Sequence, residues 1–195
     1  VQADVVAGVI DALGLGRPLL VGHSLGGAVS LATALRHPDK VNGLALIAPL
    51  IYMPSQVSDA FAALAIRYSW LRKLVGWTLA VPLSIRKREQ VLGVVFGPEQ
   101  APKDFPIRGG GLLGLRPSHF IAASRDLTAL EAVLPQMQLR YDDLRLPIGI
   151  LYGREDRILD AQEQGQTLAD RLDNVELTLI DGGHMLPITQ PEACL

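Results

Sequence analysis

The apolar positions of the chain form short continuous runs near its two ends and recur at helical spacing elsewhere. Two of these runs, at residues 18–21 and 41–48, have the length and composition of buried strands. Residues 26–36 between them carry small side chains and predict a helix that ends before Pro38. A strand, a helix and a second strand in this order predict a parallel pair of strands with a right-handed crossover.

The same order of elements returns in the last part of the chain. Residues 146–152 and 175–180 are apolar runs that predict two more strands, and residues 161–172 between them predict a helix. Alternation of strands and helices is typical of an α/β protein with a parallel sheet.

Strand patterns are absent from the sequence between these two parts. Three segments there have helical character, at residues 59–79, 84–95 and 118–134. The breaks between them are predicted at Pro82, at Gly97-Pro98 and at glycines 109–111. We therefore predict an α/β core built from residues 1–49 and 145–195, interrupted by a helical cap at residues 50–144.

The sequence patterns at both ends of the chain are those of interrupted helices. A first helix is predicted to start at or before residue 1 and to end at Gly14 or Gly16. Its apolar positions are Val5, Val6, Val9, Ile10 and Leu13. Residues 190–193 read as the opening of a helix that stops almost at once. We expect the chain to be a fragment of a longer protein.

Composition excludes several classes of function. Apolar residues make up 49% of the chain and charged residues 19%, which allows a sizeable core. The net charge of −2 provides no basic face, so we expect no nucleic-acid partner. Cys194 is the single cysteine, which excludes an internal disulfide and a cysteine-rich metal site. No apolar run reaches the ~18 residues of a membrane span. We expect no metal, no cofactor and a cytoplasmic location.

The sequence GHSLG at residues 22–26 lies between the first predicted strand and its helix and fits the pattern G-x-S-x-G. Side chains two residues before and after the serine would collide, so glycine is expected at both positions, and Gly27 lets the helix pack closely. The helix N-terminus points at Ser24, where the N–H of Leu25 faces a developing oxyanion. We predict Ser24 as a nucleophile and Leu25 as an oxyanion donor. The alternative is an ordinary glycine-rich turn with a capping serine.

A serine hydroxyl needs a base to take its proton, and the chain has four histidines. His184 follows the last strand, on a loop that two glycines are expected to make pliable, at the same carboxyl edge as Ser24. His23 is expected to point away from the serine hydroxyl and to pack or hydrogen-bond locally. His37 suits a helix end, and His119 begins a helical segment of the cap. We predict His184 as the base; the alternative is a solvated loop histidine.

An acidic residue must orient the imidazole and stabilise its charged form. Asp156 follows the predicted strand at 146–152, again at the carboxyl edge of the sheet. Glu155, Asp160 and Asp181 are competitors, of which Asp160 is the second choice and Asp181 is expected to bond within its loop. We predict Asp156, and the order serine, acid, histidine is the one expected for a hydrolase on an α/β sheet.

The segments "LLVGHSLGGAVSLA", "GREDRILD" and "DGGHMLP" resemble the α/β-hydrolase superfamily, in the branch that carries a helical cap. The resemblance implies a partial α/β-hydrolase fold, with a parallel sheet, flanking helices and an inserted helical cap that shapes the substrate pocket. It also implies a serine hydrolase with Ser24, Asp156 and His184 as the catalytic triad. Serine at the turn argues against the dehalogenases and epoxide hydrolases of the superfamily, which have aspartate there.

The sequence departs from the pattern of the superfamily in one respect. Superfamily members carry earlier strands and a His-Gly loop that supplies a second oxyanion N–H, and neither is found in this sequence. Arg108 and the glycines at 109–111 follow the serine and lack that histidine, so they are interpreted as a cap hinge or turn. The strand at 18–21 would lack its inner neighbour, so we expect the chain by itself to aggregate and to be nearly inactive.

The cap holds most of the aromatic residues, namely Phe61, Tyr68, Trp70, Trp77, Phe96 and Phe120. They either roof an apolar substrate pocket or pack the cap onto the core. Residues 71–89 have an apolar centre between basic ends. Pro82 and the scattered charges favour a helix–Pro–helix pair with solvated ends; the alternative is a segment lying on a lipid interface.

These residues favour a serine hydrolase that cleaves a small ester or related acyl substrate with an apolar group through an acyl-enzyme. Acyl transfer and carbon–carbon bond hydrolysis use the same triad and stay open. A non-catalytic small-molecule receptor is the alternative from another class. The oligomeric state is not predicted.

Overall fold

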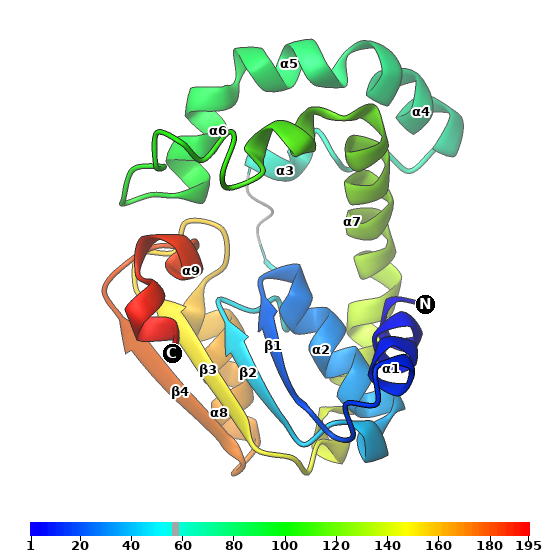
Figure 1. The fold of residues 1–195 in the computed structure, drawn as a ribbon, viewed down its shortest axis with the longest axis vertical. Coiled ribbons are helices and arrows are strands. Elements are labelled where there is room, and N and C mark those ends of the chain that lie inside the picture. The colour runs from blue at the N-terminus through cyan, green and yellow to red at the C-terminus, as the bar shows by residue number, and fades with distance from the viewer. Residues whose placement is uncertain (56–58) are drawn as a thin grey trace.

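The computed structural model describes residues 1–55 and 59–195 (Figure 1). Its centre is a sheet of four parallel strands in the spatial order β1-β2-β3-β4. The strands are β1 (Leu19–His23), β2 (Gly43–Ile47), β3 (Ile148–Gly153) and β4 (Val175–Ile180). All four lie within two or three residues of the predicted apolar runs, and the parallel α/β sheet is confirmed.

Helices connect and cover the strands. In the core these are α1 (Gln2–Ala12), α2 (Leu25–Arg36), η1 (Pro38–Lys40), η3 (Tyr141–Asp143), the π-helical turn η4 (Gln162–Gln166), α8 (Thr167–Arg171), α9 (Leu186–Thr189) and η5 (Pro191–Cys194). The helix α1 packs on α2, and α8 packs on β4. The carboxyl ends of the strands point toward the cap (Figure 1).

The cap lies above the carboxyl edge of the sheet (Figure 1). It contains α3 (Asp59–Ala62), α4 (Ser69–Thr78), α5 (Ala80–Arg86), α6 (Arg88–Val95), η2 (Gly111–Leu115) and the first part of α7 (Pro117–Gln138). The helix α7 runs from the cap down beside α2. Its buried Leu134 and Met137 join the core cluster, together with Tyr141 and Leu144 that follow the helix. The cap boundaries at residues 50–144 stay a prediction.

Prolines break these helices less than expected. Pro82 lies in the first turn of α5, where a missing N–H is tolerated, and the break between α4 and α5 is at Leu79 instead. Pro135 lies inside α7, which continues to Gln138 although the sequence predicted an end near residue 134. The burial of Leu134 and Met137 on either side of Pro135 keeps these last turns helical.

The first helix ends as predicted, before Gly14 and Gly16, which both have positive φ angles. Its buried residues are Ala3, Ala7 and Ile10. Its remaining apolar positions are mostly exposed, including Val5, Val9 and Leu13. The edge strand β1 likewise exposes Leu19 and Val21, by 58% and 66%. Alternate residues of an edge strand share one face, so these two side chains form an apolar strip along the sheet.

The cap aromatics do not behave as one group. Phe96 is fully buried and contacts Phe105 edge-on, with ring centroids 4.8 Å apart. Tyr68, Trp70 and Trp77 are 64–71% exposed. For these three residues the predicted packing onto the core is wrong, and the role of pocket roof stays a prediction. Within the described part of the chain, no helix is both long and apolar enough to cross a bilayer.

Candidate active site

Ser24 lies at the sharp corner between β1 and α2. Its backbone has φ 53° and ψ −120°, a left-handed conformation that costs a non-glycine residue about 1–3 kcal/mol. Backbone bonds fix this corner, because the N–H of Ser24 donates to Ile47 O of β2 and the Ser24 carbonyl accepts from the N–H of Leu50. Such strain is maintained by the surrounding structure and is typical of a functional position.

The glycines around Ser24 differ in whether the structure has room for a side chain at their positions. A Cβ on Gly22 would lie 2.6 Å from the carbonyl oxygen of Gly26, and one on Gly27 would lie 2.4 Å from Pro49 Cβ. A Cβ on Gly26 would meet nothing within 4 Å among the described atoms. The predicted steric need for glycine therefore holds for Gly22 and is wrong for Gly26. Gly27 approaches the loop after β2.

The backbone N–H of Leu25 begins α2. Among residues 1–55 and 59–195 it has no hydrogen-bond acceptor, as expected for the first N–H of a helix. This N–H adjoins the Ser24 corner, and the positive end of the helix dipole points in the same direction. The position suits a donor to an oxyanion formed at Ser24.

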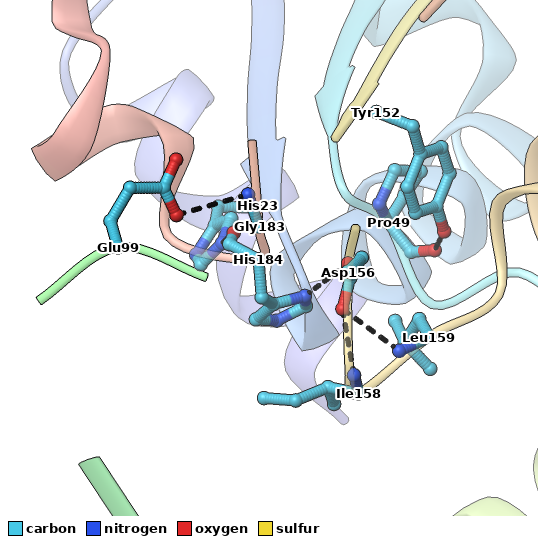
Figure 2. A network of polar contacts seen from close by, with 9 residues as sticks. All are labelled: His23, Pro49, Glu99, Tyr152, Asp156, Ile158, Leu159, Gly183 and His184. Atoms are coloured by element: carbon cyan, nitrogen blue, oxygen red, sulfur yellow. Dashed lines mark hydrogen bonds and ion pairs between the residues drawn. The ribbon is translucent and has the colours of Figure 1, made fainter. Parts of the chain in front are cut away.

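His184 and Asp156 form a buried pair (Figure 2). His184 Nδ1 donates to Asp156 Oδ2 at 2.7 Å, and the two side chains are only 4% and 1% exposed. The other carboxylate oxygen, Oδ1, accepts from the N–H groups of Ile158 at 2.8 Å and Leu159 at 3.0 Å. Because Nδ1 carries the proton in this bond, Nε2 of the neutral ring has a free lone pair.

The competing acids are bound elsewhere. Glu155 accepts from the N–H of Gly182, and Asp160 accepts from the N–H of Glu163 at 2.8 Å, which caps the next helix. The side chain of Asp181 is 93% exposed and lies 3.6 Å from Arg154. Among these four acids, the structure brings only Asp156 to His184.

His23 contacts His184, a feature that the sequence did not reveal. Its Nε2 donates to the carbonyl oxygen of His184 at 2.9 Å, and the two ring centroids are 5.0 Å apart. The expected local packing is therefore wrong: the partner lies 161 positions away in the sequence. Burial lowers the pKa of His23, and its bond to the His184 carbonyl opposes part of that effect.

The His23 contact also brings the two predicted catalytic loops together, because Ser24 is the next residue. Within the described residues no hydrogen bond joins the side chains of Ser24 and His184. Such bonds are often long in free enzymes and shorten only when substrate binds. The remaining histidines lie away from the site: His37 bonds to Asp4, and His119 is exposed on α7.

The loop of His184 is tightly packed and not pliable as predicted. A Cβ on Gly183 would lie 2.0 Å from the carbonyl oxygen of Gly97, in the segment that follows α6. The N–H of Gly183 donates to Glu99 Oε2 at 3.2 Å (Figure 2). On the Asp156 side, Arg157 Nη1 donates to the carbonyl oxygen of Gly93 at 3.3 Å. One cap segment, residues 93–99, thus contacts the loops of both His184 and Asp156.

A buried tyrosine connects two segments beside the site. Tyr152, at the end of β3, donates its hydroxyl to the carbonyl oxygen of Pro49, in the loop after β2 (Figure 2). Burial raises the pKa of Tyr152 above its usual range, so the hydroxyl stays protonated. Since Pro49 also contacts Gly27, this bond connects the strand before Asp156 to the helix after Ser24.

The sequence profile described as "alpha/beta hydrolase fold" matches residues 1–191, nearly the whole chain. The chain belongs to the alpha/beta hydrolase fold family. Among solved structures, this alpha/beta hydrolase fold chain is similar to an alpha/beta hydrolase fold protein from Burkholderia ambifaria, with a TM-score of 0.75 and 20% identity over 98% of this chain and 68% of that one. The predicted membership of the superfamily is confirmed.

Two further similar proteins extend the comparison. A 2-hydroxy-6-oxononadienedioate/2-hydroxy-6-oxononatrienedioate hydrolase from Burkholderia vietnamiensis is 28% identical over 90% of this chain. A bacterial membrane phospholipase A of known structure is 26% identical, with a TM-score of 0.68 over 99% of this chain. The chain spans only 58% of the first protein and 59% of the second.

Proposed function

We propose that this chain carries the catalytic centre of a serine hydrolase that cleaves a carboxylic ester through an acyl-enzyme. Ser24 is the nucleophile, His184 the base and Asp156 the residue that orients His184. The observation that carries the proposal is the buried 2.7 Å bond between His184 and Asp156, next to a serine held at a left-handed corner. A receptor that only binds has no use for either feature.

The reaction follows from this geometry. The Ser24 oxygen attacks the ester carbonyl carbon while His184 Nε2 takes the hydroxyl proton, and the N–H of Leu25 donates to the oxyanion. Collapse of the intermediate breaks the carbon–oxygen bond, and His184 returns its proton to the leaving alcohol. Water then attacks the acyl-serine with the same base, which releases the acid and restores Ser24.

The role of Asp156 is electrostatic and orienting. It holds the proton of neutral His184 on Nδ1, so that Nε2 is always the acceptor, and it stabilises the imidazolium that forms. Asp156→Asn would favour the wrong tautomer and is expected to reduce turnover by about 10⁴-fold.

Labelling of the full-length protein with a fluorophosphonate probe tests the assignment. We expect one adduct, on Ser24, that is lost in Ser24→Ala and strongly slowed in His184→Ala. Turnover of p-nitrophenyl esters should disappear in the same two variants. Labelling on another residue, or ester turnover in Ser24→Ala, would refute the proposal, and a folded protein without any adduct would favour a receptor.

Carbon–carbon bond hydrolysis is the second candidate, and the 28% identical Burkholderia vietnamiensis hydrolase favours it. The phospholipase, at 26% identity, favours ester cleavage. Parallel assays with a 2-hydroxy-6-oxo-dienoate and with p-nitrophenyl esters separate the two. Added alcohols then distinguish hydrolysis from acyl transfer by their ester products.

A further inference from the structure

The cap helix α4 turns its apolar side to solvent. Trp70, Leu74 and Trp77 follow one another at the spacing of a single helix face and are 64%, 53% and 71% exposed. Tyr68, immediately before the helix, is 68% exposed. We call these four residues the cap face. Figure 1 shows α4 and α5 along the side of the cap that lies farthest from the sheet.

The opposite side of α4 is fixed by polar contacts. Arg72, which is buried, donates to the carbonyl oxygen of Ile66 at 2.6 Å, to Ser124 Oγ at 2.9 Å and to Thr128 Oγ1 at 3.0 Å. At Gly76 the helix approaches α7 so closely that a Cβ would lie 2.8 Å from Ile121 Cγ1. Turning α4 to bury its tryptophans would break all of these contacts. These contacts therefore hold α4 in the orientation that exposes the cap face.

Basic residues lie in the same segment of the chain as the cap face. Residues 67–88 contain six Lys and Arg residues and no acidic residue, although the whole chain has a net charge of −2. Lys73 lies on the exposed side of α4, and Arg86, Lys87 and Arg88 are exposed where α5 ends and α6 begins. None of these four forms an ion pair within residues 1–55 and 61–195, so their charge is available to an external anion.

We propose that the cap face binds the surface of a membrane that contains anionic phospholipids. Tryptophan and tyrosine favour the boundary between headgroups and acyl chains, and nearby lysines and arginines add electrostatic attraction to anionic headgroups. A ten-residue helix such as α4 can lie in the plane of that boundary but is far too short to span it. A helix that exposes tryptophans, a leucine and a lysine on one side fits this surface better than the charge-depleted core of a protein interface.

Vesicle sedimentation with the full-length protein tests the proposal. We expect binding to vesicles of phosphatidylcholine mixed with phosphatidylglycerol, weaker binding to pure phosphatidylcholine, and loss of affinity as salt is added. Trp70→Ala/Trp77→Ala should weaken binding by at least about tenfold, since two large apolar side chains no longer insert. Ile107→Ala/Leu139→Ala removes two equally exposed apolar residues outside the cap face and should leave binding unchanged.

Fluorescence gives a second measurement, because Trp70 and Trp77 are the only tryptophans of this chain. Brominated lipids should quench the signal that is lost in Trp70→Phe/Trp77→Phe. Melting temperatures show whether each variant is folded. No binding to anionic vesicles, or equal binding by the Trp70→Ala/Trp77→Ala variant, would overturn the proposal. A dimer that this variant converts to a monomer, without vesicle binding, would assign the face to a second copy instead.

Discussion

His23 and His184 lie against each other, and the ring of the first donates a hydrogen bond to the backbone carbonyl of the second at 2.9 Å. This bond joins the residue before the proposed nucleophile to the proposed base itself. His23 does not need to touch substrate to matter, because it fixes the backbone from which the His184 ring projects. We therefore consider His23 a positioning residue.

Replacing His23 should reduce turnover without removing the nucleophile. His23→Ala frees the His184 carbonyl, and a displaced base is expected to lower kcat by about 10- to 100-fold with little change in KM. His23→Gln offers an amide N–H in a similar place and should recover part of the loss. Steady-state kinetics on an ester substrate measure both, and His37→Ala is the matched control away from the site. Equal activity of His23→Ala and wild type would contradict the positioning role.

The lowered pKa of His23 predicts how stability depends on pH. The unfolded chain takes up a proton on this residue near pH 6.5, but the folded chain takes it up only at lower pH. Stability is therefore lost as pH falls from about 6.5 to the folded-state pKa, and is regained as pH rises. Urea unfolding from pH 8 to pH 5 should show a smaller loss for His23→Gln than for wild type. An identical slope would contradict the assignment.

Glu99 connects the cap to the loop of the proposed base. Glu99→Ala leaves the N–H of Gly183 without this partner and should lower kcat/KM by about tenfold, because both the loop and the cap segment lose a contact. Glu99→Gln retains an accepting oxygen and should lose less. Glu131→Ala, which removes an exposed ion pair with Arg67 inside the cap, is the control and should change little. Equal kinetics for Glu99→Ala and Glu131→Ala would argue against this connection.

Arg72 should stabilise the cap through its buried hydrogen bonds. Arg72→Met keeps most of the side-chain volume but leaves the carbonyl oxygen of Ile66 unpaired, at an expected cost of about 1–3 kcal/mol. Lys73→Met, one residue later on the exposed side, should change stability by no more than about 0.5 kcal/mol. Urea denaturation compares the two variants, and an Arg72→Met variant as stable as Lys73→Met would refute the prediction.

The two glycines of the GHSLG turn provide a steric comparison. Gly22→Ala forces a methyl group to 2.6 Å from the carbonyl oxygen of Gly26 and to 2.7 Å from Ser30 Oγ, and should destabilise the fold by about 1–3 kcal/mol. Gly26→Ala meets open space inside a helix and should be neutral or stabilising by up to about 1 kcal/mol. Thermal or urea unfolding of both variants tests this difference. Destabilisation of similar size in both would be inconsistent with it.

Local patterns were sufficient to predict the sheet and the places in the fold of the three proposed site residues. The four strands are short apolar runs, and in a parallel sheet the residues that follow them meet at one edge, as Asp156 and His184 do. The turn at Ser24 could be predicted because the glycines that indicate it are its neighbours in the sequence. These are cases in which sequence neighbours determine the structure.

Contacts between distant segments could not be predicted from the sequence in the same way. His23 and Glu99 reach partners that are 161 and 84 positions away, and no periodicity in the sequence marks such a pair. The helical segment predicted at residues 118–134 continues past Pro135 to Gln138, because burial on both sides of that proline outweighs its missing N–H. The tryptophans of α4 were expected to roof a pocket or to pack on the core, and no local pattern indicates that Arg72 is the residue of this helix that is buried instead.

The helix α7 belongs to both layers of the molecule, since its first turns carry the cap and its last turns lie in the core. Each residue inserted into or deleted from a helix rotates everything beyond it by about 100° and shifts it by about 1.5 Å. The number of residues in α7 thus determines which way the cap faces over the sheet. Related chains that gain or lose a single residue in this helix would have to turn their caps about its axis or compensate elsewhere.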